Sequence, residues 1–296
     1  MASDGTGGGG ALINFDGLSK VGNALIEKIS DAIGGLAKPW QMVRVAKAEA
    51  QVEMIRSQAK IAISETEERA ILRMVREEGK RQENIESITA KAIPELSPEA
   101  KPETLENDWL VYFFDRCRLV SDDEMQTIWS KILAGEANKP KSFSRRTVDL
   151  VATLDKADAE LFTNFCTFLW TASGSVPMIF DVNDQIFKNF GINFMSLTHL
   201  DDIGLISFSN IMTFSRLSLP RRAMLSYYGQ HVIIEFPDDQ NNLGTGHALL
   251  TRAGQELANI CSSTPSEEYF QYVLKRWSNK NYILSMSLAA RPLAVS

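Results

Sequence analysis

The side chains best suited to acid–base or metal chemistry are three histidines and two acidic pairs. The histidines fall on different predicted elements, and the sequence holds no Walker loop, nucleophile elbow, HExxH or Cys-x-x-Cys motif. Charge at a helix N-terminus explains the first acidic pair, and a solvated loop explains the second. We therefore predict no catalytic residue, no cofactor and no metal site, and we keep a hydrolase with an unrecognised site as an alternative. The residues concerned are His199, His231, His247, Asp122–Asp123 and Asp238–Asp239.

The cysteines indicate a reducing compartment, and the lengths of the apolar runs predict no membrane-spanning segment. Cys117, Cys166 and Cys261 are odd in number and far apart in the sequence, so we expect free thiols and no disulfide. The sequence opens without a signal-peptide pattern and has no run of about 18 apolar residues. The expected location is the cytoplasm, with peripheral membrane contact as an alternative.

The charge balance disfavours a nucleic-acid partner. The formal net charge is -6, and a polyanion needs a basic patch. Four arginines are candidates for such a patch beside a predicted recognition helix at 198–202, but Asp201 and Asp202 would face the phosphates. A DNA-binding regulator is therefore an alternative only. The candidate nucleic-acid contacts are Arg216, Arg221, Arg222 and Arg252.

The N-terminal part of the chain is predicted to hold a flexible Gly-rich tail (1–17) and then a short amphipathic helix (18–36). The helix is apolar on one face and mixed in charge on the other, and Gly34, Gly35 and Pro39 end it. Its apolar face is expected to pack on the chain itself or on a protein partner, with a membrane surface as the alternative. The residues of this face are Leu18, Val21, Leu25, Ile26, Ile29 and Ile33.

A long helical arm is predicted from Trp40 to Ile93, so that helical segments occupy 18–93. The stretch has no proline and is rich in the best helix formers. Its apolar stripe is thin and alternates steps of three and four, as a coiled-coil seam does. Because a lone helix cannot bury this stripe, the arm must either fold back on the globular part or pair with copies of itself. We predict the second, a homo-oligomer. The self-association residues are Val52, Ile55, Ala59, Ala62, Met74, Ile85 and Ile88.

A proline-rich linker (94–105) is predicted to separate the arm from a helical bundle (106–172). The bundle begins with an aromatic helix face from Trp109 to Cys117. Its central helix is expected to start with a capping box at Ser121 and Glu124 and to stop at Gly135.

The remainder (173–277) is predicted to be a winged-helix-like module, followed by a C-terminal tail (278–296). Two β-like runs, 223–228 and 231–236, flank Gly229–Gln230 at hairpin spacing. Helices, then a hairpin, then a helix is the order of a winged helix. The predicted fold class is thus mainly α: a long N-terminal helical arm, a helical bundle and a small α+β winged-helix-like C-terminal module.

Several motifs resemble a bacterial domain-of-unknown-function family over roughly residues 18–277. The helix that begins at Ser121 is similar to the Abi-alpha group of abortive-infection proteins, which the resemblance links to defence against phage. The family has no assigned catalytic residues, so the resemblance transfers none. The motifs are Arg81–Gln82, Asn84–Ile85–Glu86, Asp108–Trp109, 120–126, Trp129, 132–136, 142–147 and 249–257.

These observations together predict a non-enzymatic, self-assembling bacterial protein that acts in phage defence or stress through macromolecular recognition. Two alternatives stay open: a membrane-acting effector that uses the helix at 18–36, and a DNA-binding regulator.

Overall fold

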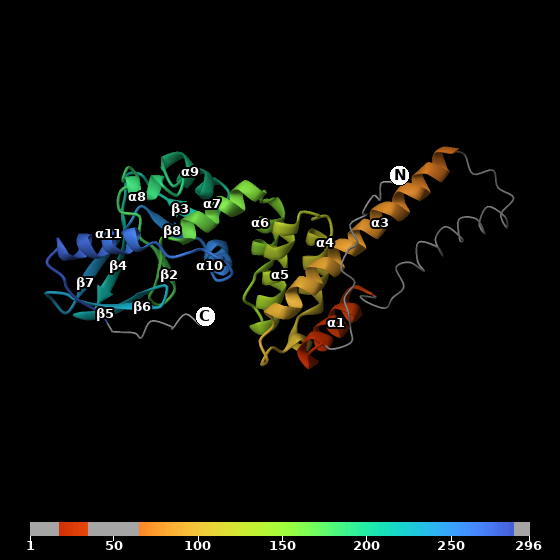
Figure 1. The fold of residues 1–296 in the computed structure, drawn as a ribbon, viewed down its shortest axis with the longest axis horizontal. Coiled ribbons are helices and arrows are strands. Elements are labelled where there is room, and N and C mark those ends of the chain that lie inside the picture. The colour runs from red at the N-terminus through yellow and green to blue at the C-terminus, as the bar shows by residue number, and fades with distance from the viewer. Residues whose placement is uncertain (1–17, 35–64, 287–296) are drawn as a thin grey trace, which may run out of the picture. The chain divides into compact units, whose positions relative to one another are not determined.

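The computed structural model describes residues 18–34 and 65–286 and divides the chain into two compact units, Met1–Ala152 and Thr153–Ser296. The predicted Gly-rich tail, the first half of the predicted arm and the last ten residues lie outside the described residues. Figure 1 labels the elements of each unit.

The described part of the first unit is helical (Figure 1). The stretch expected as a linker, 94–105, contains two 3-10 turns and packs within this unit, against α1 and α3. The elements are α1 (Lys20–Ile33), α3 (Glu65–Ala92), η1 (Ile93–Glu95), η2 (Pro102–Thr104), α4 (Asn107–Cys117), α5 (Asp123–Asn138) and α6 (Arg145–Thr153).

Aromatic rings of α4 and α5 form the core of the first unit. The predicted aromatic face of α4 is confirmed, because Trp109, Phe113 and Cys117 are all buried. The Phe113 ring lies 5.0 Å from the ring of Trp109 and 5.2 Å from that of Trp129. Trp109 Nε1 donates to the Phe143 carbonyl at 2.8 Å, which satisfies its polar edge inside the core.

The central helix α5 exists as predicted, but its two ends differ from the prediction. Asp122, not Ser121, caps it by accepting from the Met125 amide, while Ser121 accepts a hydrogen bond from Asn84. The helix continues past Gly135 to Asn138. A Cβ atom at Gly135 would lie 2.6 Å from Cε2 of Phe143. Glycine is used here for close ring packing and not as a stop.

The second unit combines helices with three small sheets. The strands are β1 (Leu169–Thr171), β2 (Ser175–Pro177), β3 (Ile206–Phe208), β4 (Phe214–Leu219), β5 (Arg222–Tyr227), β6 (Gln230–Glu235), β7 (Asn241–Gly246), β8 (Ala248–Leu250) and β9 (Ile283–Met286). The helices are α7 (Lys156–Cys166), α8 (Gln185–Lys188), α9 (Phe194–Asp202), α10 (Arg252–Ala258) and α11 (Glu267–Ser278).

A five-stranded antiparallel sheet, in the order β2-β1-β5-β6-β9, is the largest of the three. Its centre is the hairpin β5–β6, which confirms the hairpin predicted from the sequence. Tyr228 (φ 44°) and Gly229 (φ 82°) form the turn, with Leu225 paired to Val232 and Tyr227 to Gln230. Two positive φ angles give a turn whose twist matches that of the strands.

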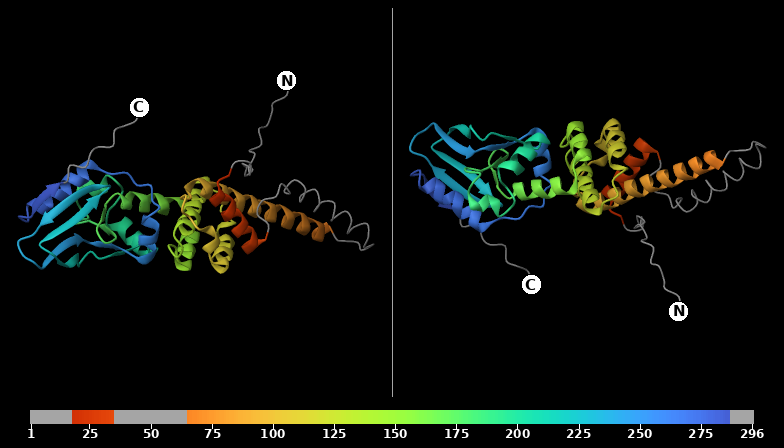
Figure 2. Two further views of the ribbon diagram at one scale, coloured as in Figure 1. Left: turned by 90° about the horizontal axis from the view of Figure 1, so that it is seen from below. Right: turned by 90° about the horizontal axis from the view of Figure 1, so that it is seen from above.

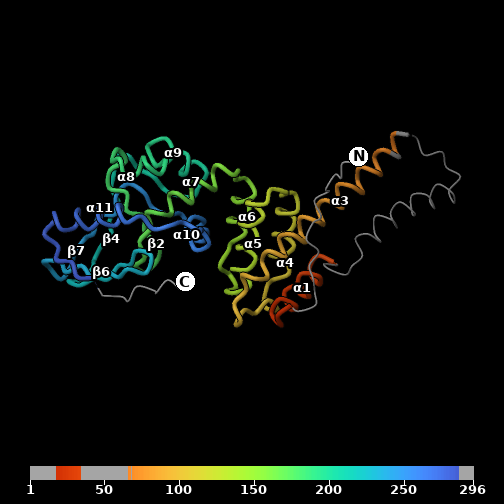
Figure 3. Tube along the Cα trace, viewed as in Figure 1, coloured from red at the N-terminus to blue at the C-terminus, as the bar shows by residue number. Residues whose placement is uncertain are grey.

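Helix α11 covers one face of this sheet (Figure 2). Aromatic side chains fill the contact between the helix and the sheet. The Trp170 ring lies 4.8 Å from that of Trp277 and 5.6 Å from that of Phe270, and Tyr227 stacks on Phe270 at 5.7 Å. The tube in Figure 3 follows the chain from α10 into α11. We call the covered side the inner face of the sheet and the opposite side the outer face.

The predicted fold class is wrong. The region expected to be a winged helix holds most of a five-stranded antiparallel sheet and two further strand pairs, so the fold is helical and β together. Strand β1 was expected to continue a helix, because Phe165 and Leu169 share helical spacing. Strand β7 contains two asparagines and two glycines, which have low β propensity. Strand β9 fell in the expected tail.

The described part of the predicted arm is α3, and only its C-terminal half packs on the other helices of the first unit. Its C-terminal half packs along α5 (Figure 1). Ile85, Ile88 and Ala92 are buried there. The stripe in this half is therefore covered by the chain's own helices.

Candidate functional site

The outer face of the five-stranded sheet exposes apolar side chains on three neighbouring strands. Met224 of β5 pairs in register with Ile233 of β6, and Ile283 of β9 pairs with Glu235 of β6. The exposed fractions of Met224, Ile233 and Ile283 are 62%, 37% and 63%. Side chains alternate across a strand. The buried Leu225 and Val232 therefore face α11, and the exposed residues lie on the opposite side.

A charged hollow of about 720 Å³ lies at the end of the β5–β6 hairpin away from its turn, lined by Pro220, Arg221, Arg222, Glu235 and Asp239. Arg222 donates to Glu235 Oε2 from Nε at 3.1 Å and from Nη2 at 3.0 Å. Arg221 Nε lies 3.7 Å from Glu235 Oε1, which is an ion-pair distance and too long for a strong hydrogen bond. Both guanidinium groups are exposed. Glu235 therefore forms ion pairs with both Arg221 and Arg222.

We define the outer-face patch as Met224, Ile233 and Ile283 together with Arg221, Arg222, Glu235 and Asp239. The register pairs Arg222 with Glu235 and Glu235 with Ile283, so the charged and apolar parts adjoin on the same face. An apolar centre beside arginines is the composition of a protein–protein interface.

The four arginines proposed for nucleic acid do not act as one group. Only Arg221 and Arg222 line the hollow, where two carboxylates accompany them. Arg216 donates to Ser173 Oγ at 2.6 Å, and Arg252 pairs with Glu256 at 2.9 Å, one turn along α10. Their charge is already compensated or directed to local partners, which weakens the case for phosphate binding.

The apolar face of the N-terminal helix is occupied within the first unit. Leu25, Ile26 and Ile29 are buried, and α1 packs against α4 and η2. The outer members of the predicted face, Leu18, Val21 and Ile33, are half-buried. In the described residues, no helix is both long and apolar enough to cross a membrane.

The predicted self-association seam is only partly described. Val52, Ile55, Ala59 and Ala62 lie outside the described residues. Among the others, Ile85 and Ile88 are buried in the first unit and Met74 is 63% exposed.

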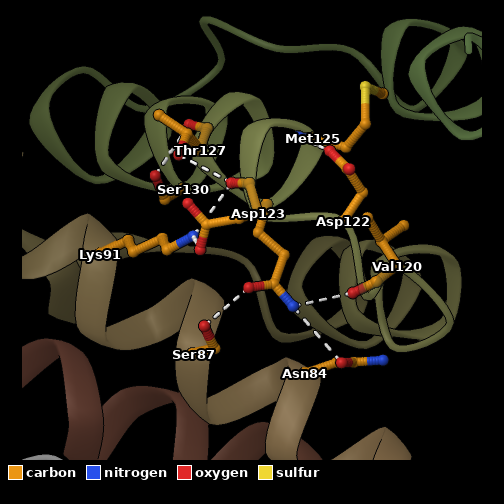
Figure 4. A network of polar contacts seen from close by, with 10 residues as sticks. Asn84, Ser87, Lys91, Val120, Asp122, Asp123, Met125, Thr127 and Ser130 are labelled. Atoms are coloured by element: carbon orange, nitrogen blue, oxygen red, sulfur yellow. Dashed lines mark hydrogen bonds and ion pairs between the residues drawn. The ribbon is translucent and has the colours of Figure 1, made fainter. Parts of the chain in front are cut away.

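The residues that carry the family resemblance build a buried polar clamp between α3 and α5 (Figure 4). Gln126 Nε2 donates to the Val120 carbonyl at 2.9 Å, and Gln126 Oε1 accepts from Ser87 Oγ at 2.7 Å. Asn84 Nδ2 donates to the Arg118 carbonyl at 2.8 Å, and Asn84 Oδ1 accepts from Gln126 Nε2 at 3.3 Å. Asn84 and Gln126 are 3% and 5% exposed. These motif residues therefore have a structural role, which fixes how α3 sits on α5.

Lys91 closes the same clamp near the surface. Its ammonium group contacts Asp123 Oδ1 at 2.5 Å and the Asp123 carbonyl at 3.0 Å (Figure 4). Asp122 caps α5, so both members of this acidic pair have structural partners.

The histidines lie apart, as expected from the sequence. His199 Nε2 contacts Asp158 Oδ1 at 2.6 Å, and His247 Nδ1 contacts the Ser209 carbonyl at 2.8 Å, while His231 is exposed. Burial raises the pKa of Asp158, but hydrogen bonds from His199 and the Asp155 amide outweigh it and hold this pKa below 3.8. Across the described ranges 18–34 and 65–286, no three metal-binding side chains gather.

The outer-face patch was not predicted, although the sequence contains a signal for it. In Arg222–Tyr227 and Gln230–Glu235, apolar residues occupy positions on both sides of the alternation. A hairpin with one solvated face normally has polar residues there. The register with β9, some 50 residues later, cannot be read from the sequence.

Comparison with known proteins gives one match. The profile of a family described as "Protein of unknown function (DUF2806)" matches residues 68–274. None of the curated proteins and none of the solved structures compared with the chain matches it. The matched region includes the α3–α5 clamp and every strand except β9. The chain therefore belongs to the DUF2806 family of proteins of unknown function.

Proposed function

We propose that this protein is a non-enzymatic, self-assembling component, and that two copies associate through the outer-face patch of the sheet. The observation that carries the proposal is the exposure of Met224, Ile233 and Ile283 on three adjacent strands. Burial of a fully exposed side chain of this kind gives about 1.5–3 kcal/mol, and each of these three would give the fraction that corresponds to its remaining exposure. Covering the face that α11 leaves open would therefore be energetically favourable.

A second copy fits the charges of the patch. Two guanidinium groups and two carboxylates line one hollow, so their formal charges cancel and a second copy would bring both signs of charge to the contact. Among the described residues, the Arg221 guanidinium makes the long ion pair with Glu235, and its remaining N–H donors suit a carboxylate such as Asp239 of a second copy. A polyanion would meet Glu235 and Asp239 in the same hollow, which favours a protein surface over nucleic acid.

Sedimentation velocity of the full chain at micromolar concentration tests this proposal. The wild type should give a species of twice the 33.0 kDa monomer. The double substitution Met224→Glu and Ile283→Glu places two carboxylates in the apolar centre and should weaken assembly about tenfold or more, because burial desolvates them. Leu217→Glu is the matched control, since Leu217 is 67% exposed on β4, outside this sheet.

The following results would contradict association through the outer-face patch. A monomeric wild type at micromolar concentration, or an assembly that the double substitution leaves intact, would overturn the proposal. Equal weakening by Leu217→Glu would do the same. Val52→Glu with Ile55→Glu tests the predicted arm seam: loss of assembly in this variant, with the sheet variant unaffected, would transfer self-association to the arm.

We also propose that this assembly acts in bacterial defence against phage, because the sequence that forms α5 and its N-terminal cap resembles abortive-infection proteins. Plaque counts on bacteria that express the chain test this step. The wild type and Leu217→Glu should both lower plaque number, and the variant with Met224→Glu and Ile283→Glu should not. Equal plaque numbers with and without the wild-type chain would refute the assignment.

A further inference from the structure

Two of the three cysteines, 95 positions apart in the sequence, meet in the second unit. Cys166 is the last residue of α7 and is buried, whereas Cys261 follows α10 and is partly exposed. Their side chains are hydrogen-bonded to each other, and both are free thiols. The two cysteines are far apart in the sequence but lie side by side in the fold.

Tyr228 independently ties together the two segments that contain these thiols. Its hydroxyl donates to the Cys166 carbonyl at 3.4 Å and hydrogen-bonds with Ser263 Oγ. Ser263 is two residues beyond Cys261, so one phenol bridges the end of α7 and the loop that leads to α11. The contact of the two thiols is therefore part of the packed fold.

The two thiols differ in access to solvent. The hydrogen bond with Cys261 and burial both raise the pKa of Cys166 well above its usual value, so Cys166 is protonated and shielded at neutral pH. Cys261 is the thiol that a dissolved oxidant reaches first. The remaining cysteine, Cys117, is buried in the helical core of the first unit.

We propose that Cys166 and Cys261 form a reversible disulfide when the protein meets hydrogen peroxide. The Cys261 thiolate attacks one peroxide oxygen, the O–O bond breaks, and the leaving hydroxide takes a proton to become water. Cys261 is then a sulfenic acid. The Cys166 sulfur loses its proton and attacks the Cys261 sulfur, the S–O bond breaks, and a second water leaves. Two thiols and one peroxide thus give one disulfide and two waters.

Peptide mapping of the oxidised full chain tests the proposal directly. Trypsin separates the cysteines onto peptides 117–118, 157–188 and 253–275. After peroxide treatment and alkylation of free thiols, we expect 157–188 linked to 253–275, release of the link by dithiothreitol, and alkylated Cys117. Closure of so long a loop should also raise the melting temperature of the second unit by on the order of 10 °C.

Variants separate the two chemical steps. Cys117→Ser should form the same link as the wild type. Cys166→Ser should stop at the Cys261 sulfenic acid, which dimedone traps. Oxidation of wild-type Cys261 without the link, or a link between two chains in its place, would overturn the proposal. The mapping of the wild type needs no variant, so a substitution that impairs folding leaves the test intact.

Discussion

The main contacts inside each of the two units bury different kinds of side chain. In the described chain, the buried polar residues Asn84, Thr89, Gln126, Ser130, Glu136 and Thr147 are in the first unit, and only Thr167 and Thr245 are in the second. The second unit buries a layer of aromatic rings between its sheet and α11. Apolar area supplies most of the stability of a fold, whereas satisfied polar groups specify one arrangement. In the first unit, buried polar contacts fix the position of α3 along α5. In the second unit, buried apolar surface area holds α11 on the sheet.

Removal of a central aromatic ring should cause the largest loss of stability, and this loss should be confined to the second unit. Trp170 is fully buried between Tyr227, Phe270 and Trp277. Trp170→Ala should lower the free energy of unfolding of this unit by about 3–5 kcal/mol, because a large cavity remains. Hydrogen exchange measured by mass spectrometry should speed up in β5, β6 and α11 and stay unchanged in α3 and α5. A uniform increase in both units would break the comparison.

Loss of the clamp amide should have a smaller effect, in the first unit. Gln126→Leu keeps the apolar contacts and leaves the Val120 carbonyl and the Ser87 hydroxyl without this partner. We expect a loss of about 1–3 kcal/mol in chemical denaturation. Gln271→Leu is the control, since Gln271 is exposed and bonds only to Glu267 one turn away. If both substitutions cost the same, the buried amide does not specify the contact between α3 and α5.

The smallest effect concerns an acid-sensitive contact between α7 and α9. Because the folded-state pKa of Asp158 lies below 3.8, its carboxylate stabilises the second unit above about pH 3.8, and this contribution is lost as pH falls through the folded-state pKa. His199→Ala should destabilise the unit by less than about 1 kcal/mol near pH 5. The difference from wild type should shrink in acid, as urea unfolding at several pH values would show. A difference that grows in acid would contradict the assignment.

The sequence predicts local structure well and long-range pairing poorly. Amphipathic spacing and caps identify α4, α6 and α7, and Gly229 marks the turn of β5–β6. Strands of three residues, such as β1, are too short to show a period. The register that brings Ile283 beside Glu235 depends on the whole unit. For the same reason, no local pattern could reveal that Cys166 meets Cys261.

The candidate functional residues show the same contrast: the local sequence predicts their character, but only the fold shows their partners. The apolar face of the helix at 18–36 is correctly read as apolar, but only packing shows that α4 and η2 cover Leu25, Ile26 and Ile29. Likewise Arg221 and Arg222 are recognisable as positive charges in the sequence. Their shared carboxylate, Glu235, lies across the hairpin, and it changes what they can bind.

The aromatic layer under the sheet also makes the second unit optically distinctive. The indoles of Trp170 and Trp277 lie 4.8 Å apart at an interplanar angle of 61°. Transition dipoles at such a distance couple strongly and are not parallel, so the pair should give an exciton couplet in ultraviolet circular dichroism. Because Trp109 and Trp129 of the first unit also absorb, the couplet is identified by its loss in Trp277→Phe. Its disappearance on heating the wild type then reports the unfolding of the second unit without any attached dye.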